Sequence, residues 1–309
     1  MPTRKERLEG GLVGLLVGDA LGVPYEFHAA PDIPPPEQLD FDPPPGFRRA
    51  HRGVPPGTWS DDGAQALCLL ASLLEHGALN PDDFATKLLA WEQDGYLAVD
   101  GQVFDMGIQT QRALGALRRG IPALEAGPSG ERENGNGSLM RVLPLALWHQ
   151  GTDAELVRDA QLQSRVTHGH PRSQLCCALY CLWARRTLEG VPEAWREAVA
   201  AMRALHPEGT PERRELEDGV RAGAPPGGKG SGYVVDCLHS ARAAVEAGSY
   251  EAVVKAAVRL GDDTDTTAAV AGGIVGVRDG IGAIPEKWRR GLRGQELLQP
   301  LLDALLARG

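Results

Sequence analysis

Helical periodicity runs through almost the whole chain and constrains the fold more than any other feature of the sequence. Apolar residues recur at three- and four-residue spacing, whereas the alternating pattern of a half-buried strand is almost absent. After a first helix that includes Leu8 to Asp19, helices are expected at 65–75, 82–93, 107–119, 139–149, 154–166, 173–188, 193–205, 234–247, 250–260, 266–277 and 296–307. The sequence therefore predicts an all-α fold, a compact single-domain bundle of about a dozen helices over residues 1–309.

Glycine and proline mark two further features of the sequence, a row of glycines on one helix and three irregular segments between helices. Gly10, Gly14, Gly18 and Gly22 recur at four-residue steps, which places them on one face of the first helix, where a neighbouring helix can approach closely. Three segments interrupt the helices: 31–56, which holds nine of the 23 prolines, and the glycine-rich stretches 127–137 and 222–232. Irregular segments of this length in a compact domain more often carry function than serve only as connections.

Composition and net charge restrict the kinds of partner and compartment that are expected for this protein. The formal net charge is −9, so the average field of the protein repels phosphate and disfavours a nucleic-acid-coating role. The apolar stretch 12–23 is too short for a membrane span, and no secretion signal is expected at the charged N-terminus. The five cysteines are odd in number and lack a C-x-x-C spacing, which favours buried apolar residues over zinc or redox roles. We expect a cytoplasmic protein.

Two acidic segments, Thr58–Asp62 and Asp262–Thr267, each stand directly ahead of a predicted helix. Ser, Thr and Asp are preferred helix N-caps, so either segment alone is explained by capping. Together, however, their five carboxylates repel one another unless they are spread apart or neutralised. Mg²⁺, Mn²⁺ and Ca²⁺ prefer such carboxylate and hydroxyl oxygens, and the absence of His and Cys argues against zinc.

Three further segments have both a functional and a purely structural interpretation. Glu26 follows the first helix in an apolar and aromatic setting, but taken alone it is an ordinary surface carboxylate. The loop 134–141 leads into a helix and could bind an anion or simply form a turn. His168 and His170 could contact a ligand or flank a turn. The G-x-x-x-x-G-K-G at 223–230 lacks the Ser or Thr of a phosphate-binding P-loop, and no strand precedes it.

Taken in order, these motifs resemble the ADP-ribosylglycohydrolase family. The resemblance covers residues 10–278 and rests on an ordered set whose members are weak singly: Gly18-Asp19-Ala20-Leu21-Gly22 with Glu26, Trp59-Ser60-Asp61-Asp62, Asn136-Gly137-Ser138-Leu139-Met140-Arg141, Thr167-His168, Gly232-Tyr233-Val234-Val235-Asp236 and Gly261 to Thr266.

This resemblance implies an all-α fold with a binuclear centre of two divalent cations, Mg²⁺ or Mn²⁺, and hydrolysis of the bond between ADP-ribose and a protein side chain. The implied metal ligands are Ser60, Asp61, Asp62, Asp263, Asp265 and Thr266. The implied catalytic residues are Glu26, at the ribose and the metals, and Asp105. The resemblance also implies residues that contact ADP-ribose. The loop Gly135, Asn136, Gly137 and Ser138 would surround the diphosphate, and Met140 follows it. His168 and Tyr233 would flank the ribose and the adenine.

The chain departs from the family pattern in three places. Ser60 stands where the family has Thr but keeps a hydroxyl. Of the two other departures, Gly63 stands where the family has a second Thr, and Asp262 adds a carboxylate next to Asp263. Neither change removes an implied ligand, so we expect an active enzyme, a monomer without membrane association that acts on an ADP-ribosylated protein or an ADP-ribose-containing small molecule. An arginine linkage is favoured. The alternatives are O-linked serine adducts, O-acetyl-ADP-ribose, ADP-ribosylated nucleic-acid ends, an unrelated metal-dependent phosphohydrolase, or a non-catalytic binding or structural protein.

Overall fold

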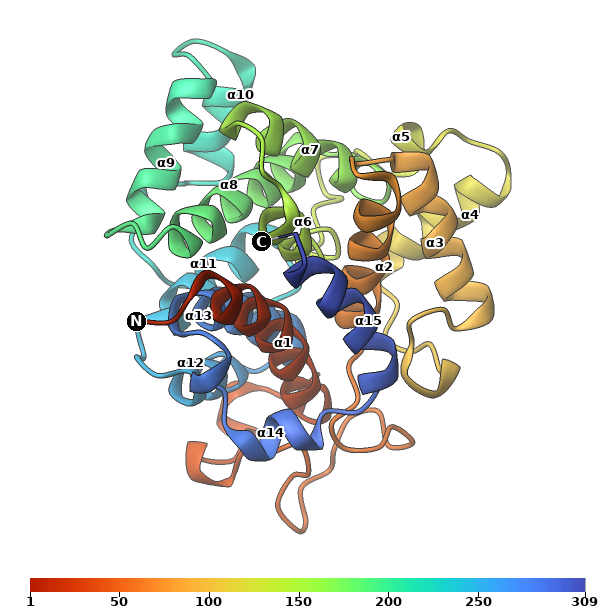
Figure 1. Cartoon of the computed structure of the whole chain (residues 1–309), viewed down its shortest axis with the longest axis vertical. Helices are drawn as coiled ribbons and strands as arrows, with labels where there is room; N and C mark the ends of the chain where they lie inside the picture. The colour runs from red at the N-terminus through yellow and green to blue at the C-terminus, as the bar shows by residue number, and fades with distance from the viewer. Residues whose placement is uncertain (309) are drawn as a thin grey trace.

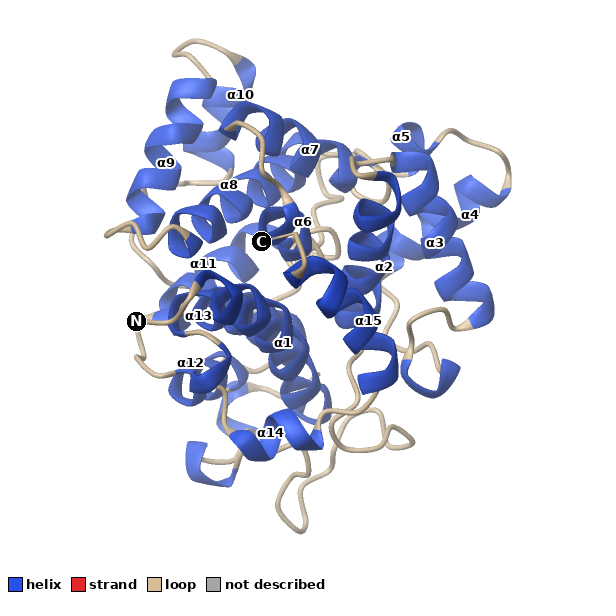
Figure 2. Cartoon of the chain, in the orientation of Figure 1, coloured by secondary structure: helices blue, strands red, loops and turns tan. Residues whose placement is uncertain are grey.

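The protein is built from helices joined by loops, as the computed structural model shows for residues 1–308 (Figure 2). Within these residues there is no sheet, and the backbone pairs in extended form only at two isolated bridges, Ala29 with Gly261 and Gly135 with Tyr233. The α-helices are α1 (Arg4–Gly22), α2 (Asp61–His76), α3 (Pro81–Asp94), α4 (Ile108–Arg118), α5 (Ala123–Ala126), α6 (Leu143–Trp148), α7 (Asp153–Arg165), α8 (Pro171–Leu188), α9 (Ala194–Leu205), α10 (Pro211–Arg214), α11 (Val234–Val245), α12 (Tyr250–Val258), α13 (Thr264–Asp279), α14 (Glu286–Gly291) and α15 (Gln295–Leu306). The all-α prediction is confirmed.

Helices α1 and α13 pack side by side through the middle of the bundle (Figure 1). The glycine stripe of α1 makes this contact: a Cβ atom added to Gly18 would lie 2.2 Å from the carbonyl oxygen of Ala268, and one on Gly22 would lie 2.3 Å from Cα of Asp265. Any larger residue would force the helices apart, so the predicted close approach is confirmed. The contact holds the end of α1 against the start of α13.

The acidic segments lie partly inside the helices that they were expected to precede. Helix α2 begins at Asp61, because the hydroxyl of Ser60 accepts a hydrogen bond from the backbone N–H of Asp62 at 3.3 Å. Helix α13 begins at Thr264, so Asp265 lies in its first turn. The positive end of each helix dipole favours carboxylates at these positions. The predicted helix 139–149 is shorter, Leu143–Trp148, because residues 136–142 form turns and Pro144 starts the helix.

The structure also bears on the expectations for the cysteines, for the proline-rich segment and for membrane-spanning helices. All five cysteines are buried and free, as the apolar interpretation predicts. The segment 31–56 is irregular apart from two short 3₁₀ turns, Ala30–Asp32 and Pro36–Gln38. Further short turns are Val23–Tyr25, Val99–Gly101, Ile281–Ala283 and the π-helical Glu215–Gly219. Among the helices that residues 1–308 form, none combines the length and apolar character that a membrane crossing requires.

Candidate active site

A cavity of about 450 Å³ opens beside the first turns of α2 and α13, a volume within the range of small-molecule sites. Most of the predicted site residues meet there. Its lining residues are Glu26, Phe27, Asp61, Asp62, Asp105, Met106, Gly107, Ile108, Gln109, Thr110, Gly135, Asn136, Gly137, Met140, His168, Gly232, Asp263 and Thr266. Ser60, Asp265, Ser138 and Tyr233 are the predicted residues outside this lining, although each adjoins it in the chain or through hydrogen bonds.

Asp19 of α1 positions the start of α2. Its buried carboxylate accepts hydrogen bonds from the backbone N–H of Ser60, at 2.9 and 3.0 Å, and from that of Gly63, at 2.8 Å. A Cβ atom on Gly63 would lie 2.7 Å from Cδ2 of Leu16 and 2.8 Å from the Trp59 side chain. The glycine that departs from the family pattern is therefore required by close packing here.

The first turns of α2 and α13 touch through side chains of the two acidic segments. The hydroxyl of Thr266 donates to Oδ1 of Asp62 at 3.3 Å, and Nδ2 of Asn136 donates to Oδ2 of Asp263 at 2.8 Å. One carboxylate oxygen each of Glu26, Asp263 and Asp265 lies within 4.8 Å of the other two. Three segments far apart in the sequence thus converge on one group of oxygens, as the resemblance implies.

These carboxylates have no cationic partner of their own. Oδ2 of Asp62 and Oδ2 of Asp265 are buried and hydrogen-bond to nothing in residues 1–308. Among the residues that line the cavity, none is Lys or Arg. A buried unpaired carboxylate is costly, and the oxygen-rich donor set is the kind that Mg²⁺, Mn²⁺ and Ca²⁺ bind. The residues present therefore fit a divalent cation.

The electrostatics of the cavity reflect the same crowding. Burial, followed by the charges of neighbouring carboxylates, raises the pKa values of Glu26, Asp61, Asp62 and Asp265 well above the ordinary range. Burial also raises the pKa of Asp105 to about 6. Without a cation, the cavity favours the protonated form of these groups, and a bound cation reverses that preference.

A buried arginine connects the acidic group to the glycine-rich loop. Nη1 of Arg141 donates to Oε1 of Gln65 at 2.8 Å, and Nε2 of Gln65 donates to Oδ2 of Asp61 at 2.9 Å. On its other side, Nε of Arg141 donates to Oε1 of Gln163 at 3.2 Å, and the Gln163 amide donates to the carbonyl of Ser138. The chain of contacts fixes Asp61 and the loop relative to each other.

The glycine-rich loop lines the cavity next to the acidic group, because Asn136 of this loop donates to Asp263. Its backbone pairs with the segment before α11, since the N–H of Asn136 donates to the carbonyl of Gly232 at 3.0 Å. Cβ atoms on Gly135 and Gly137 would lie 2.8 Å from Oε1 of Gln109 and 2.9 Å from Cε1 of His168, so both glycines leave room for these side chains. The backbone N–H groups of Gly137 and Ser138 donate to no acceptor in residues 1–308, which leaves two donors for an anion.

Three predicted ligand contacts have distinct environments. Burial lowers the pKa of His168 to about 3, so its imidazole faces the cavity uncharged. Tyr233 is exposed, and its hydroxyl accepts a hydrogen bond from Nη1 of Arg172 at 3.3 Å. The hydroxyl of Ser138 is buried against that of Ser164 at 2.8 Å, so the side chain of Ser138 faces away from a ligand. Only its backbone is available to an anion.

The sequence interpretation missed His51. Nε2 of His51 lies 2.6 Å from Oε2 of Glu26 and 3.7 Å from Oδ1 of Asp105. It comes from the proline-rich segment 31–56, for which the sequence indicated a functional role without singling out a residue. No residue of that segment belongs to the cavity lining, and His51 is its contact with the candidate catalytic carboxylates. A single histidine in an irregular segment carries no spacing signal, so the sequence alone could not single it out.

Comparisons with known proteins agree with the fold. The family model for ADP-ribosylglycohydrolase matches residues 1–309, and the chain belongs to this family of metal-dependent ADP-ribosylhydrolases, which makes it a hydrolase. It is 31% identical to ADP-ribosylarginine hydrolase Tri1 of Pseudomonas putida, over 98% of this chain and 78% of that protein. It is 28% identical to ADP-ribosyl-[dinitrogen reductase] glycohydrolase of Rhodospirillum rubrum, over 99% and 97% of the two chains. A solved ADP-ribosylglycohydrolase-related protein complex superposes with a TM-score of 0.78 at 32% identity, covering 99% of this chain and 98% of the other.

Proposed function

We propose that this hydrolase releases ADP-ribose from arginine side chains of modified proteins, with two Mg²⁺ or Mn²⁺ ions held in the cavity. The observation that carries the proposal is the group of buried carboxylates at the first turns of α2 and α13, which has no Lys or Arg in the cavity lining and keeps two oxygens without a hydrogen bond. The arginine linkage is supported by relatives named for ADP-ribosylarginine hydrolysis.

Six residues would hold the cations. Ser60, Asp61 and Asp62 belong to the start of α2, and Asp263, Asp265 and Thr266 to the start of α13. When bound, the cations would supply Lewis acidity and lower the pKa of a coordinated water from about 15.7 towards neutrality. Oδ2 of Asp62 and Oδ2 of Asp265 are buried without a hydrogen bond, and coordination of a cation would explain their burial.

The protein's own groups would orient the substrate and move its protons. The backbone donors of Gly137 and Ser138 would receive the diphosphate, and His168 and Tyr233 would flank ribose and adenine. In the absence of a cation, burial raises the pKa values of Glu26 and Asp105, and both side chains line the cavity beside the proposed ligands. We assign to this pair the delivery of a proton to the departing side chain as positive charge develops at the anomeric carbon.

Release of ADP-ribose tests the proposal. An arginine-linked and a serine-linked substrate are each incubated with Mg²⁺, with Mn²⁺ and with chelator. We expect metal-dependent release from the arginine-linked substrate. Release only from the serine-linked substrate would overturn the linkage, and release unaffected by chelator would overturn the metal site.

Asp263→Asn gives the matching test of the ligand set. Losing one charged ligand should lower kcat by about 100-fold or more, the scale on which single electrostatic groups act in active sites. Asp153→Asn removes a carboxylate from a different cluster, on α7, and should retain turnover. Near-wild-type hydrolysis by Asp263→Asn would contradict the assignment.

A further inference from the structure

His51 sits in a compact cage beside the candidate catalytic carboxylates. In addition to its contacts with Glu26 and Asp105, its ring is near two aromatic side chains: the ring centroids of Phe27 and Phe104 are 5.6 and 5.1 Å away, both tilted against the imidazole. Nothing in the proposed hydrolysis uses this histidine. Two carboxylates and two aromatic rings favour a flat cation here, and they act against the positive charge of nearby Arg49.

The backbone around this cage is held in an uncommon conformation. Phe27, His51 and Asp105 have φ angles of 63°, 47° and 60°, in the left-handed region that non-glycine residues seldom adopt. Phe27 is also 70% exposed, although it is a large apolar side chain. Strained backbone of this kind clusters at ligand sites and switch segments, where function maintains it.

The short stretch 48–54 that carries His51 makes few backbone hydrogen bonds, whereas the earlier part of the segment is held in the core by Ile33, Leu39 and Phe41. Within this stretch the N–H of Ala50 donates to the carbonyl of Pro24 at 2.9 Å, and the other backbone hydrogen bonds are local turns. A Cβ atom on Gly53 would meet nothing within 4 Å. Displacement of this stretch would therefore break few hydrogen bonds.

We propose that His51 determines specificity by filling the leaving-group subsite until a planar cation displaces it. This inference rests on the proposed function, because the arginine side chain is the leaving group that the subsite would receive. A guanidinium offers Glu26 and Asp105 two parallel hydrogen bonds and a permanent charge, which repays the lost contact of the imidazole. A neutral group of the same shape offers no charge and leaves His51 in place.

Binding of methylguanidinium and of its neutral counterpart methylurea tests this role without hydrolysis. Both are titrated into wild type, His51→Ala and His51→Gln with Mg²⁺ present, because a bound cation favours the ionised form of Glu26 and Asp105. We expect methylguanidinium to bind His51→Ala about tenfold more tightly than wild type, which corresponds to about 1.4 kcal/mol. His51→Gln retains an amide donor towards Glu26 and should stay close to wild type. Methylurea should show no such gain.

His76→Ala is the matched control, because His76 ends α2 at the helix terminus opposite the cavity. It should leave both affinities unchanged. Unchanged or weaker methylguanidinium binding by His51→Ala would overturn the proposal, and so would an equal gain for methylurea. With a hydrolysable arginine-linked substrate, His51→Ala should lower KM while ADP-ribose affinity stays the same. If wild type hydrolyses neither linkage but the tenfold gain is found, the proposed function fails and the cation subsite stands.

Discussion

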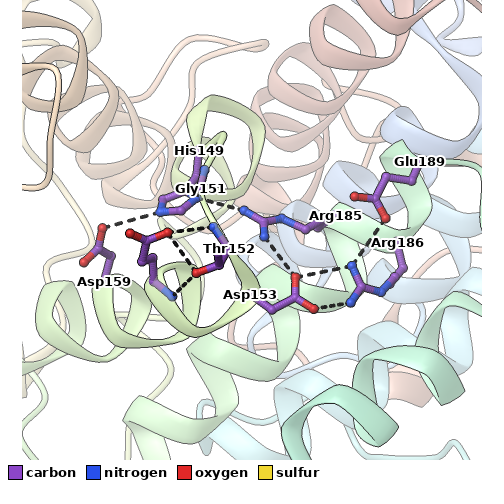
Figure 3. Close-up of polar contacts among 9 residues, drawn as sticks. His149, Gly151, Thr152, Asp153, Asp159, Arg185, Arg186 and Glu189 are labelled. Carbon is purple, nitrogen blue, oxygen red and sulfur yellow. Dashed lines mark hydrogen bonds and ion pairs between the residues drawn. The ribbon is translucent and has the colours of Figure 1, made fainter. Parts of the chain in front are cut away.

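Two groups of carboxylates in this protein are held in opposite ways. The cleft carboxylates, Glu26, Asp61, Asp62, Asp105, Asp263 and Asp265, lie together without a Lys or Arg in the cavity lining. The α7–α8 cluster, His149, Asp153, Asp159, Arg185 and Arg186, pairs its acids with bases (Figure 3). Nη1 of Arg185 donates to Oδ1 of Asp153 at 2.9 Å, and Arg186 holds both oxygens of the same carboxylate.

The two groups also differ in their pKa values. Burial by itself raises the pKa of Asp153, but hydrogen bonds from Arg186 and Arg185 outweigh it and leave the pKa below its ordinary value. In the cleft, burial and like charge act in the same direction and raise the pKa of Asp62 and Asp265. A protein that neutralises its structural acids internally, but leaves a group of six carboxylates without a Lys or Arg in the cavity lining, has prepared that group for a cation from solution.

Replacing Arg141 tests the comparison between the two groups most directly. It is fully buried next to the cleft, yet amide and carbonyl oxygens of Gln65 and Gln163 receive its hydrogen bonds instead of a carboxylate. Arg141→Met should lower the free energy of unfolding by about 3 kcal/mol, because it leaves buried acceptors unpaired. Chemical denaturation measures the loss.

Arg141→Lys serves as the control for Arg141→Met, because lysine keeps the positive charge but lacks the planar guanidinium with its several N–H donors. We expect Arg141→Lys to recover part of the stability and little of the rigidity at Asp61, so that metal affinity remains below wild type. A loss below about 1 kcal/mol in Arg141→Met would show that the buried network contributes little.

The rise of the unfolding temperature on metal binding should depend on the cleft carboxylates and not on the α7–α8 cluster. At a Mg²⁺ or Mn²⁺ concentration about 100 times Kd, the folded state gains about 2.7 kcal/mol, so the unfolding temperature rises. Wild type and Asp153→Asn should both respond, since Asp153 already has its partners. Asp62→Asn should respond little and, in chelator, should be at least as stable as wild type, because it removes repulsion among buried acids. An equal metal response in all three proteins would contradict the cleft assignment.

The sequence predicted the acidic group because its chemistry is local. Ser60, Asp61 and Asp62 adjoin in the chain, as do Asp263, Asp265 and Thr266, and oxygen-rich clusters at helix starts carry their own signal. The glycine stripe of α1 likewise predicted a close helix contact, which the structure shows against α13. Spacing on one element was sufficient in both cases.

What the sequence could not predict depends on contacts between distant segments. Asp19 was assigned to the first helix and to the first motif of the resemblance, but its hydrogen bonds to the start of α2 require the packed bundle. Ser138 was placed among the ligand contacts by its motif, whereas its hydroxyl is turned towards Ser164. His51 reaches Glu26 from an irregular segment, where no periodicity restricts the position of a side chain.

The smallest expected effect concerns the paired group and depends on pH. Asp153 has a lowered pKa in the folded protein, so its stabilising contribution is present above about pH 4, the ordinary value for Asp, and is lost as pH falls through the lowered folded pKa. Asp153→Asn should therefore lower the free energy of unfolding by about 1 to 2 kcal/mol at pH 7. The difference from wild type should shrink towards pH 3. Urea denaturation at several pH values checks this, and a difference that stays constant or grows on acidification would mean that Asp153 stabilises the fold through packing instead of through its charge.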